Sequence, residues 1–582
     1  MSSLISAVAW VRRGVAQQHP TKYVLDDQEL DRVSKLARIE LEDARMELER
    51  AHKAALEMGQ GLEVEDEGGD EGEGECNGEG EVKEGVDGDE DWEDEDDDDA
   101  MDVDSAPKKK KGKAAKGADD LSEYKLDDYD EEETDTGGLF SNIKGLTYYK
   151  DNEEDPYITL KDDPEDDERQ ELEILPTDNL LVVAKTEDEI SQLEIFVYDE
   201  SEENLYTHHD LMLPSFPLCL EWLDYPPVSS SSNTPAPTNA FGNYIAVGTL
   251  DPEIEIWSLD TVEAMYPATV LGRPDKTKAH VPVALGTGKK KKKKVQHRAK
   301  DASCHVDAVL GLSWNRNQRN LLASASADRT VKLWDLSRHP LGAEGTGEGG
   351  GALRSFDVHK DKVQAVQWNA SEPSVLLTGS YDRTVRTFDS RAPGTCVGAV
   401  VGSDVEALRW DPWEAYGFYV TLENGLVLNY DARTLPSNLE TPSPARFTLS
   451  AHDGAASSID VNPHIKGCIV TGGTDKLVKV WNITEEEENG KRSVSLVTSR
   501  DLGVGKVFST QWSPDDPLTL AAAGSKAKLQ LWDLGTNQGT RKVFHSKLKA
   551  AGKMLREKEA KEGHGGIIGV ADDGEESEDE ED

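Results

Sequence analysis

The chain of 582 residues carries 115 acidic and 64 basic side chains, a formal net charge of −51. Its length allows several domains, but no apolar run approaches the ~20 residues that a membrane-spanning helix needs, so we expect no membrane association. The five cysteines are widely spaced and form no CxxC pair. This usage argues against a disulfide framework or a zinc site and is typical of a reducing compartment.

Residues 1–25 contain ISAVAWV, an apolar and acid-free stretch that favours a β-strand. The pair Arg12 and Arg13 follows the apolar run instead of preceding it, which disfavours a secretory signal. A mitochondrial transit peptide is the alternative reading of this segment. We prefer a strand that pairs with a sheet further along the chain.

Residues 26–58 show a helical pattern. Apolar side chains recur at spacings of three and four and form one stripe on a charged helix: Leu30, Val33, Ala37, Leu41, Ala44, Leu48, Ala51 and Ala55. Two interpretations are open, a helix that lies against the main domain and a helix that docks on a partner.

Residues 59–138 form an acidic segment that cannot fold by itself. The stretch from 61 to 135 holds 34 acidic and 8 basic residues and few apolar ones, a composition typical of disorder. A compact basic cluster of the nuclear-localisation type lies within it and consists of Lys108, Lys109, Lys110, Lys111 and Lys113.

Residues 139–540 contain a repeated pattern. Short β-runs separated by small-residue turns each close with an aromatic residue, which is followed in most copies by Asp or Asn. The closing aromatics are Tyr198, Trp257, Trp334, Phe388, Tyr430, Trp481 and Trp532. From Trp334 onward they recur at intervals near or slightly above the ~40 to 45 residues of a WD-repeat blade. These copies predict an all-β fold, a seven-bladed WD40 β-propeller, which the strand in residues 1–25 would help to close.

Three of the copies share a further pattern, in which a histidine, a Ser or Thr and an Asp stand at the same offsets before the closing aromatic. The three sets are His305, Ser324, Asp328 and Trp334; His359, Thr378, Asp382 and Phe388; and His452, Thr471, Asp475 and Trp481. In the WD-repeat family, which these residues resemble, such a set forms a hydrogen-bonded network inside one blade. Because Phe388 has no N–H, we expect its network to be one bond short, and we expect the other four blades to depend on apolar packing.

A basic residue follows the turn aspartate in the same three copies. If these turns lie on one face, Arg329, Arg383 and Lys476 form a candidate basic rim for phosphate or an acidic peptide. A second lysine run, 289–294, lies in a basic insertion near residues 270–303. Two basic runs in so acidic a chain favour nuclear residence or RNA contact.

The C-terminal region begins with a basic segment, 541–565, whose pattern predicts an amphipathic helix. Such a helix could lie in an RNA groove or fold back on acidic residues. Residues 566–582 are predicted to form an acidic disordered tail. Within that tail Ser577 has downstream acids that acidophilic kinases favour, which makes it a candidate phosphorylation site.

Motifs for catalysis are missing from the sequence. It contains no GxxxxGK[ST], no GxSxG and no HExxH. We therefore expect a protein that is not an enzyme, without a catalytic residue, cofactor, bound metal or small-molecule substrate.

Several stretches outside the repeats are more specific: ISAVAWVRRG at the start, GLTYYKDNEEDPYITL from 145 to 160, LPTDNLLVVAKTEDEISQLEIFVYDE from 175 to 200, and HDLMLPSFPLCLEWLDY from 209 to 225. With the acidic segment and the seven repeats they resemble the periodic tryptophan protein family. The resemblance implies a WD-repeat scaffold of the nucleus and nucleolus that takes part in large-subunit ribosome assembly and ribosomal RNA processing. Its partners would be large-subunit assembly proteins and pre-ribosomal RNA, with chromatin association known for some relatives.

Two alternatives stay open. Some substrate receptors of cullin-RING ubiquitin ligases end a blade with WDxR, and this chain has FDSR at 388–391 and YDAR at 430–433, both without the tryptophan. The acidic segments favour a second alternative, a chaperone that shields basic cargo such as histones or ribosomal proteins.

Overall fold

The computed structural model describes residues 3–23, 169, 172–188, 190–228, 240–272, 300–338, 351–485, 492–550 and 566–570. The predicted helix of 26–58, the acidic segment 59–138 with its lysine cluster, the lysine run 289–294 and Ser577 lie outside the described residues. The statements below concern the described part of the chain.

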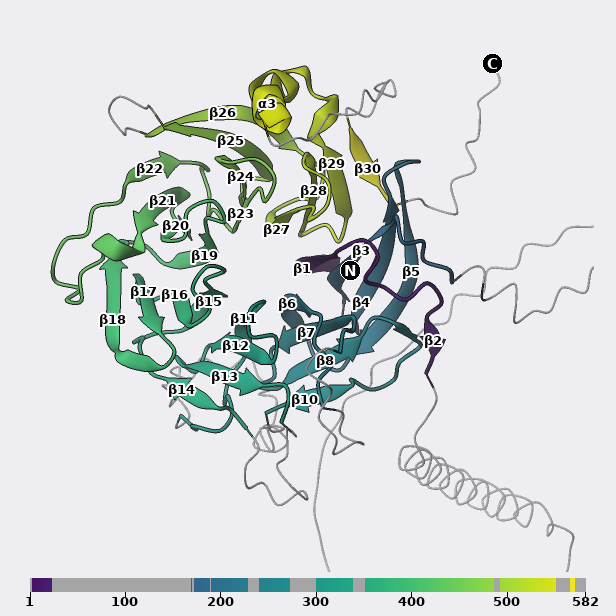
Figure 1. Cartoon of the computed structure of the whole chain (residues 1–582), viewed down its shortest axis with the longest axis horizontal. Coiled ribbons are helices and arrows are strands. Elements are labelled where there is room, and N and C mark those ends of the chain that lie inside the picture. The colour runs from purple at the N-terminus through teal and green to yellow at the C-terminus, as the bar shows by residue number, and fades with distance from the viewer. Residues whose placement is uncertain are drawn as a thin grey trace, which may run out of the picture. The chain divides into compact units, whose positions relative to one another are not determined.

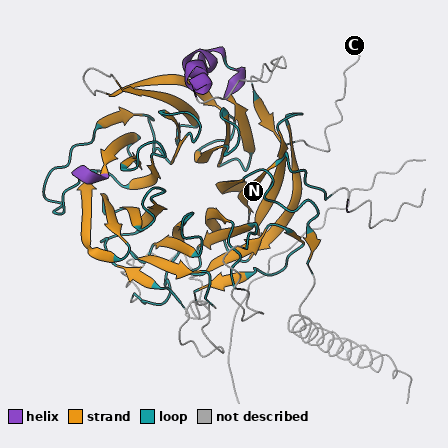
Figure 2. Ribbon diagram, in the orientation of Figure 1, coloured by secondary structure: helices purple, strands orange, loops and turns teal. Residues whose placement is uncertain are grey.

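Seven antiparallel four-stranded sheets make up the fold, and strands are its main secondary-structure elements (Figures 1 and 2). Blade 1 consists of β1 (Ser3–Val11), β3 (Asn179–Glu187), β4 (Ile190–Asp199) and β5 (Asn204–Leu213), and blade 2 of β6 (Pro217–Leu223), β7 (Tyr244–Thr249), β8 (Ile254–Ser258) and β10 (Thr269–Leu271). Blade 3 consists of β11 (Val309–Trp314), β12 (Leu321–Ser326), β13 (Val331–Asp335) and β14 (Arg354–Phe356), and blade 4 of β15 (Val363–Trp368), β16 (Val375–Ser380), β17 (Thr384–Asp389) and β18 (Ala392–Val400).

The remaining three blades follow the same order. Blade 5 consists of β19 (Val405–Trp410), β20 (Gly417–Leu422), β21 (Leu426–Asp431) and β22 (Phe447–Ser450), and blade 6 of β23 (Ser458–Val461), β24 (Cys468–Gly472), β25 (Leu477–Glu485) and β26 (Arg492–Asp501). Blade 7 consists of β27 (Val507–Trp512), β28 (Thr519–Gly524), β29 (Leu529–Asp533) and β30 (Ile567–Gly569). A short parallel pair joins β2 (Thr21–Lys22) to β9 (Thr261–Val262).

The first strand of each blade lies at the centre of the ring and contacts the first strand of the next blade, from β1 through β6, β11, β15, β19 and β23 to β27 and back to β1 (Figure 1). The prediction of a seven-bladed β-propeller is therefore confirmed. All seven closing aromatics lie on the third strand of their blades.

The core lies between neighbouring blades because side chains alternate along each strand. On β4, Leu193, Ile195 and Val197 pack towards blade 2, whereas Phe196 and Tyr198 pack towards blade 7. Blade 1 therefore contributes apolar side chains to both of its neighbours, and the ring has no free sheet face.

The two ends of the chain meet in adjacent blades. β1 is the innermost strand of blade 1 and pairs with β3, although the segment 12–178 separates them in sequence. At the other end, β30 pairs with β29 as the outermost strand of blade 7. The predicted boundary of the propeller at residue 540 and the predicted start of the disordered tail at 566 are therefore wrong, because residues 567–569 complete a blade.

Helix α3 (Gln538–Ala550) begins slightly before the predicted basic segment, and residues 551–565 lie outside the described part. Asn537 precedes it, and its side-chain oxygen accepts the N–H of Gly539 at 2.8 Å, as an N-cap does. Phe544 and Leu548 are buried in the cluster that joins blades 6 and 7. The apolar face of the helix thus packs on the propeller.

Tryptophans also lie at the last or the last but one position of most of the innermost strands, a feature that the sequence analysis missed. They are Trp10, Trp222, Trp314, Trp368, Trp410 and Trp512. In blades 3, 4, 5 and 7 the offset from this tryptophan to the closing aromatic is identical, a second fixed spacing that was available in the sequence. Blade 6 has Val461 at the same place.

In most blades the residue before this position links the blade to a neighbouring one. Side-chain oxygens of Glu221, Ser313, Gln367 and Asp460 accept the backbone N–H of Trp314, Trp368, Trp410 and Trp512 at distances of 3.0, 3.1, 2.7 and 2.8 Å. Arg409 Nε donates to Asp460 Oδ1 at 2.7 Å, and Trp10 Nε1 donates to the carbonyl of Gln511 at 3.3 Å. These contacts form a polar belt along the inner strands.

Candidate functional site

The three predicted histidine sets each come together inside one blade. In blade 3, His305 Nδ1 lies 2.9 Å from Asp328 Oδ2 and His305 Nε2 lies 2.6 Å from Ser324 Oγ. Trp334 Nε1 donates to the same Ser324 oxygen at 2.8 Å. Thr330 donates its hydroxyl and its amide to Asp328 Oδ1. Side chains from separate parts of the blade thus satisfy one another's hydrogen-bonding groups.

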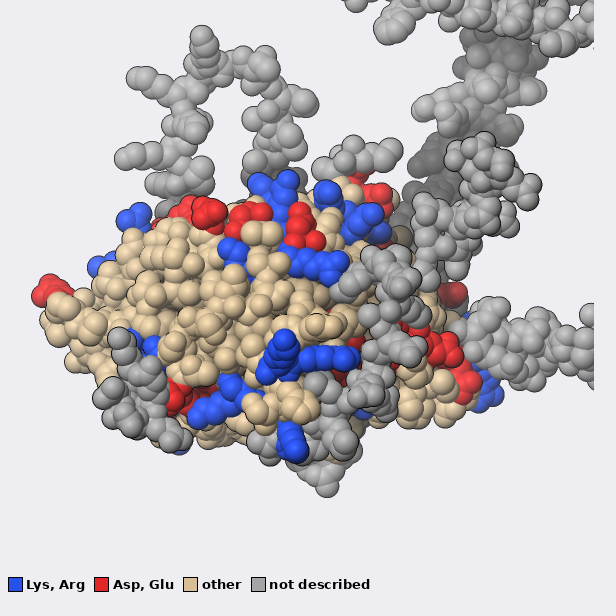
Figure 3. Space-filling view, turned by 90° about the horizontal axis from the view of Figure 1, so that it is seen from above, with Lys and Arg blue, Asp and Glu red and all other residues tan. Residues whose placement is uncertain are grey.

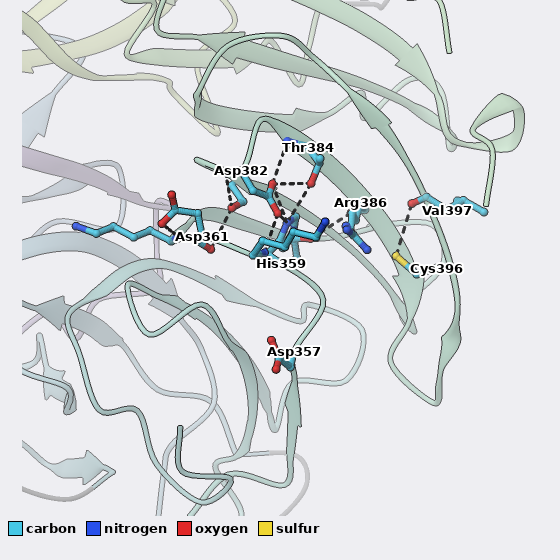
Figure 4. A network of polar contacts seen from close by, with 12 residues as sticks. Asp357, His359, Asp361, Asp382, Thr384, Arg386, Cys396 and Val397 are labelled. Carbon is cyan, nitrogen blue, oxygen red and sulfur yellow. Dashed lines mark hydrogen bonds and ion pairs between the residues drawn. The ribbon is translucent and has the colours of Figure 1, made fainter. Parts of the chain in front are cut away.

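Blade 4 carries the same arrangement with one bond fewer (Figure 4). His359 Nδ1 lies 3.1 Å from Asp382 Oδ2, and His359 Nε2 lies 2.8 Å from Thr378 Oγ1. Phe388 has no N–H to donate, and its ring packs against Phe356 with the ring centres 5.1 Å apart. Thr378 also donates to the carbonyl of Arg386 at 3.3 Å.

Blade 6 has the complete set. His452 Nδ1 lies 2.9 Å from Asp475 Oδ1, His452 Nε2 lies 2.8 Å from Thr471 Oγ1, and Trp481 Nε1 donates to Thr471 Oγ1 at 2.9 Å. Asp475 is more exposed than Asp328, with 13% of its side chain accessible against 1%.

These networks are structural. The three histidine side chains are inaccessible to solvent. Burial lowers the pKa of each histidine even though its aspartate opposes the shift, so the imidazole is neutral at pH 7 and donates from Nδ1. Burial alone would raise the pKa of Asp328, but hydrogen bonds from His305 and Thr330 outweigh it and lower that pKa to about 2. No substrate could reach the three imidazoles.

The closing tryptophans of blades 2 and 7 differ from those of blades 3 and 6 in the hydrogen bonding of the indole N–H. In blade 2, Trp257 Nε1 donates to Glu255 Oε2 at 3.0 Å. In blade 7, the N–H of the buried Trp532 has no partner among the described residues, because Ala522 stands where blades 3, 4 and 6 have Ser or Thr. The expectation that both blades depend on packing alone therefore misses the polar contact of Trp257.

Replacing Ala522 with Ser is expected to stabilise the propeller by about 1 kcal/mol. The new hydroxyl would accept the N–H of Trp532, as Ser324 does for Trp334, and would be close to the carbonyl of Gln530. Urea unfolding followed by tryptophan fluorescence measures the change. Ala522→Cys, whose side chain is close to serine in size but whose sulfur is a weak acceptor, is the control, and an equal gain in both variants would contradict the hydrogen-bond explanation.

Glu255 makes the stability of blade 2 depend on pH. Burial, with smaller effects of Glu253 and Asp251, raises the pKa of Glu255 to about 7. The folded chain therefore holds this proton more tightly than the unfolded chain, and Glu255 costs stability as the pH rises from 4.5 through about 7. Glu255→Gln keeps an acceptor for Trp257 without the charge. We expect the variant to exceed the parent by about 2 kcal/mol at pH 8 and to match it at pH 4.5 in urea unfolding; an equal difference at both pH values would refute this.

The three residues of the predicted basic rim occupy equivalent turns between the second and third strands of blades 3, 4 and 6. Arg329, Arg383 and Lys476 all have left-handed backbones, with φ of 70°, 63° and 70°. Arg383 Nε lies 3.2 Å from Asp404 Oδ1, an ion pair that offsets its charge. The three positions therefore do not present equal positive charge.

Acidic residues interrupt the rim around Arg383. Burial, with smaller effects of the nearby Glu406, Asp404 and Glu423, raises the pKa of Tyr381 to about 12. In the edge-on view, Lys and Arg side chains gather in local groups beside a broad uncharged area (Figure 3). The positive charge of Arg383 is therefore offset by carboxylates close to it.

The described residues offer neither a candidate metal site nor a candidate membrane span. No group of three His, Cys, Asp or Glu side chains among them could hold a metal ion. No helix in that same part of the chain is long and apolar enough to cross a bilayer.

The comparisons with known proteins agree with this geometry. The family model for the WD domain, G-beta repeat, matches residues 298–335, 350–389 and 444–482, which cover the three blades with histidine networks. Together with the seven blades, this makes the chain a WD-repeat protein, whose propeller is a non-enzymatic scaffold fold.

The relatives of the chain indicate one family within the WD-repeat proteins. A WD repeat-containing protein of Schizosaccharomyces pombe is 40% identical over 94% of this chain and 92% of its own length. Periodic tryptophan protein 1 of Saccharomyces cerevisiae is 34% identical over 96% of this chain and 93% of the yeast protein, and its Drosophila melanogaster homolog is 28% identical over 93% and 96%. The chain belongs to the periodic tryptophan protein 1 family.

Proposed function

We propose that this chain is a scaffold for assembly of the large ribosomal subunit and for ribosomal RNA processing in the nucleolus. Membership of the periodic tryptophan protein 1 family, over nearly the whole chain, is the observation that carries the proposal. This membership agrees with the resemblance of the sequence segments outside the repeats to the same family.

The architecture supports a binding role. The recurring polar side chains of the blades form hydrogen bonds inside the blades, as the His305 network illustrates. The loops at the two rims are therefore the segments that can contact partners. We propose large-subunit assembly proteins and pre-ribosomal RNA as these partners. Residence in the nucleus is proposed from the lysine cluster at 108–113.

The test is a pull-down of the tagged full chain from nuclear extract, washed at low and at high salt, with bound RNA sequenced and bound proteins identified. Large-subunit precursor RNA together with its assembly proteins is the expected result, and a fluorescently tagged chain is expected in nucleoli. Recovery of a ubiquitin-ligase adaptor, or of histones, without precursor RNA would overturn the proposal in favour of the receptor or the chaperone alternative.

A further inference from the structure

Three loops on one rim of blades 6 and 7 are joined by backbone hydrogen bonds. They are the β24–β25 turn (473–476), the β26–β27 connection (502–506) and the β28–β29 turn (525–528). The N–H of Val507 donates to the carbonyl of Gly473 at 3.2 Å, and the N–H of Lys526 donates to the carbonyl of Val504 at 3.1 Å. The middle loop therefore fixes the two turns relative to each other.

The junction between the middle loop and the β28–β29 turn is tight. Lys506 and Ser525 exchange two bonds, in which the N–H of Ser525 donates to the carbonyl of Lys506 and the N–H of Lys506 donates to Ser525 Oγ, both at 2.9 Å. A Cβ on Gly505, which has a φ of 76°, would lie 2.5 Å from Ser525 Oγ, so this approach needs glycine. The three loops thus form one continuous and rigid surface.

Four exposed lysines project from this surface, which we call the lysine surface: Lys476, Lys506, Lys526 and Lys528. Within the described residues, none of their ammonium groups has an ion pair or a hydrogen bond. Two neighbouring carboxylates are already engaged, Asp475 by His452 and Asp501 by the N–H of Gly503 at 2.8 Å. The four charges are therefore available to a ligand.

The chemistry of the lysine surface favours a phosphate backbone over a peptide. Protein partners are usually anchored by aromatic or large apolar side chains, and the strongly exposed apolar residues of the described chain include none from these loops. Lysines act as point charges on flexible stems and neutralise phosphates without the paired geometry that arginine imposes. Such a surface would recognise a polyanion by charge spacing and not by base sequence.

We propose that the lysine surface of blades 6 and 7 binds the phosphate backbone of RNA without sequence specificity. This proposal deepens the proposed function and rests on it for the identity of the RNA. The fixed loops would orient the propeller on the RNA, while the net charge of −51 opposes contact elsewhere.

The test uses the full chain with Lys506, Lys526 and Lys528 changed to Gln; Lys476 is retained because its turn has a left-handed backbone. The matched control changes three other exposed lysines, Lys360 and Lys362 in the loop before β15 and Lys466 in the loop before β24. Fluorescence anisotropy with a labelled uridine oligomer of about 20 nucleotides gives the Kd across a salt series. We expect the lysine-surface variant to bind about tenfold more weakly at 0.1 M salt, and the slope of log K against log salt to fall in magnitude by about 2.

Each outcome is decisive. Equal weakening in the control variant, unchanged binding in the lysine-surface variant, or no binding by the parent chain would overturn the proposal. A lysine-dependent affinity for a labelled polyglutamate peptide with none for the oligomer would assign the surface to an acidic protein instead. The nuclear-extract pull-down distinguishes failure of this proposal from failure of the proposed function. If the lysine-surface variant binds the oligomer as the parent does and still recovers precursor RNA, the RNA-binding role of the lysine surface is refuted and the assembly role stands.

Discussion

A chain that lacks residues 1–13 is expected to lose the folded propeller. The deletion removes β1, whose side chains Ile5, Val8, Trp10 and Val11 are buried between blades 1, 2 and 7. At roughly 1.5 to 3 kcal/mol for each apolar side chain, the loss is on the order of 8 kcal/mol. That matches the whole folding free energy of about 5 to 15 kcal/mol of a typical domain.

Polar contacts add to this loss. Arg13 Nη2 lies 3.1 Å from Glu200 of blade 1 and 2.7 Å from Asp516 of blade 7, and the N–H of Arg13 donates to Asp515 at 3.0 Å. Without Arg13 these carboxylates would repel one another at the closure of the ring. Unfolding of the truncated chain is followed by circular dichroism and tryptophan fluorescence. We expect neither signal to show a cooperative transition.

Adding the missing strand in trans separates a lost strand from a general folding defect. A peptide of residues 1–23 is expected to restore the transition in a concentration-dependent way, and the same peptide with Trp10→Ala and Arg13→Ala is expected to restore less. A truncated chain that unfolds cooperatively at the parent midpoint would show that six complete blades and one three-stranded blade suffice.

Asp328→Ala is expected to destabilise the chain by about 3 kcal/mol. The change leaves His305 Nδ1–H and the hydroxyl and amide of Thr330 without an acceptor in a buried site. Each unpaired buried donor costs about 1 to 3 kcal/mol, and relaxation of the turn recovers part of the sum. Urea unfolding at pH 7 measures the difference.

The equivalent change in blade 6 is the matched control for Asp328→Ala. Asp475→Ala removes the same type of acceptor, but Asp475 is more exposed, so water can replace part of the lost bonding. We expect a loss about half as large. If both variants lose the same free energy, burial does not determine the cost of breaking these networks.

The regular parts of this fold were predictable because they repeat at fixed spacing. The seven closing aromatics and the three histidine sets each depend on residues within one blade, so a periodic search finds them. The inner tryptophans repeat in the same way, since the offset from Trp314 to Trp334 equals the offset from Trp512 to Trp532.

The parts that the sequence analysis missed depend on distant contacts. Ile567–Gly569 is too short to show a periodicity, and it becomes a strand only because β29 offers a free edge after α3. The lysine surface combines residues from three loops, and it is defined by the hydrogen bonds of Lys506 with Ser525, of Lys526 with Val504 and of Val507 with Gly473. The partner residues of Arg13 likewise come from both ends of the ring.

The division of blade 1 between β1 and β3 has a topological consequence. The acidic segment lies between β2 and β3 in the sequence, and both of these strands pair within the described part of the chain, β2 with β9 and β3 with β1. It is therefore an internal segment of the sequence and not an amino-terminal tail. A protease that cuts it once would leave two polypeptides held together by the pairing of β1 with β3, the pairing of β2 with β9 and the ion pairs of Arg13, so on a denaturing gel the protein would be in two pieces while in solution it would migrate as one.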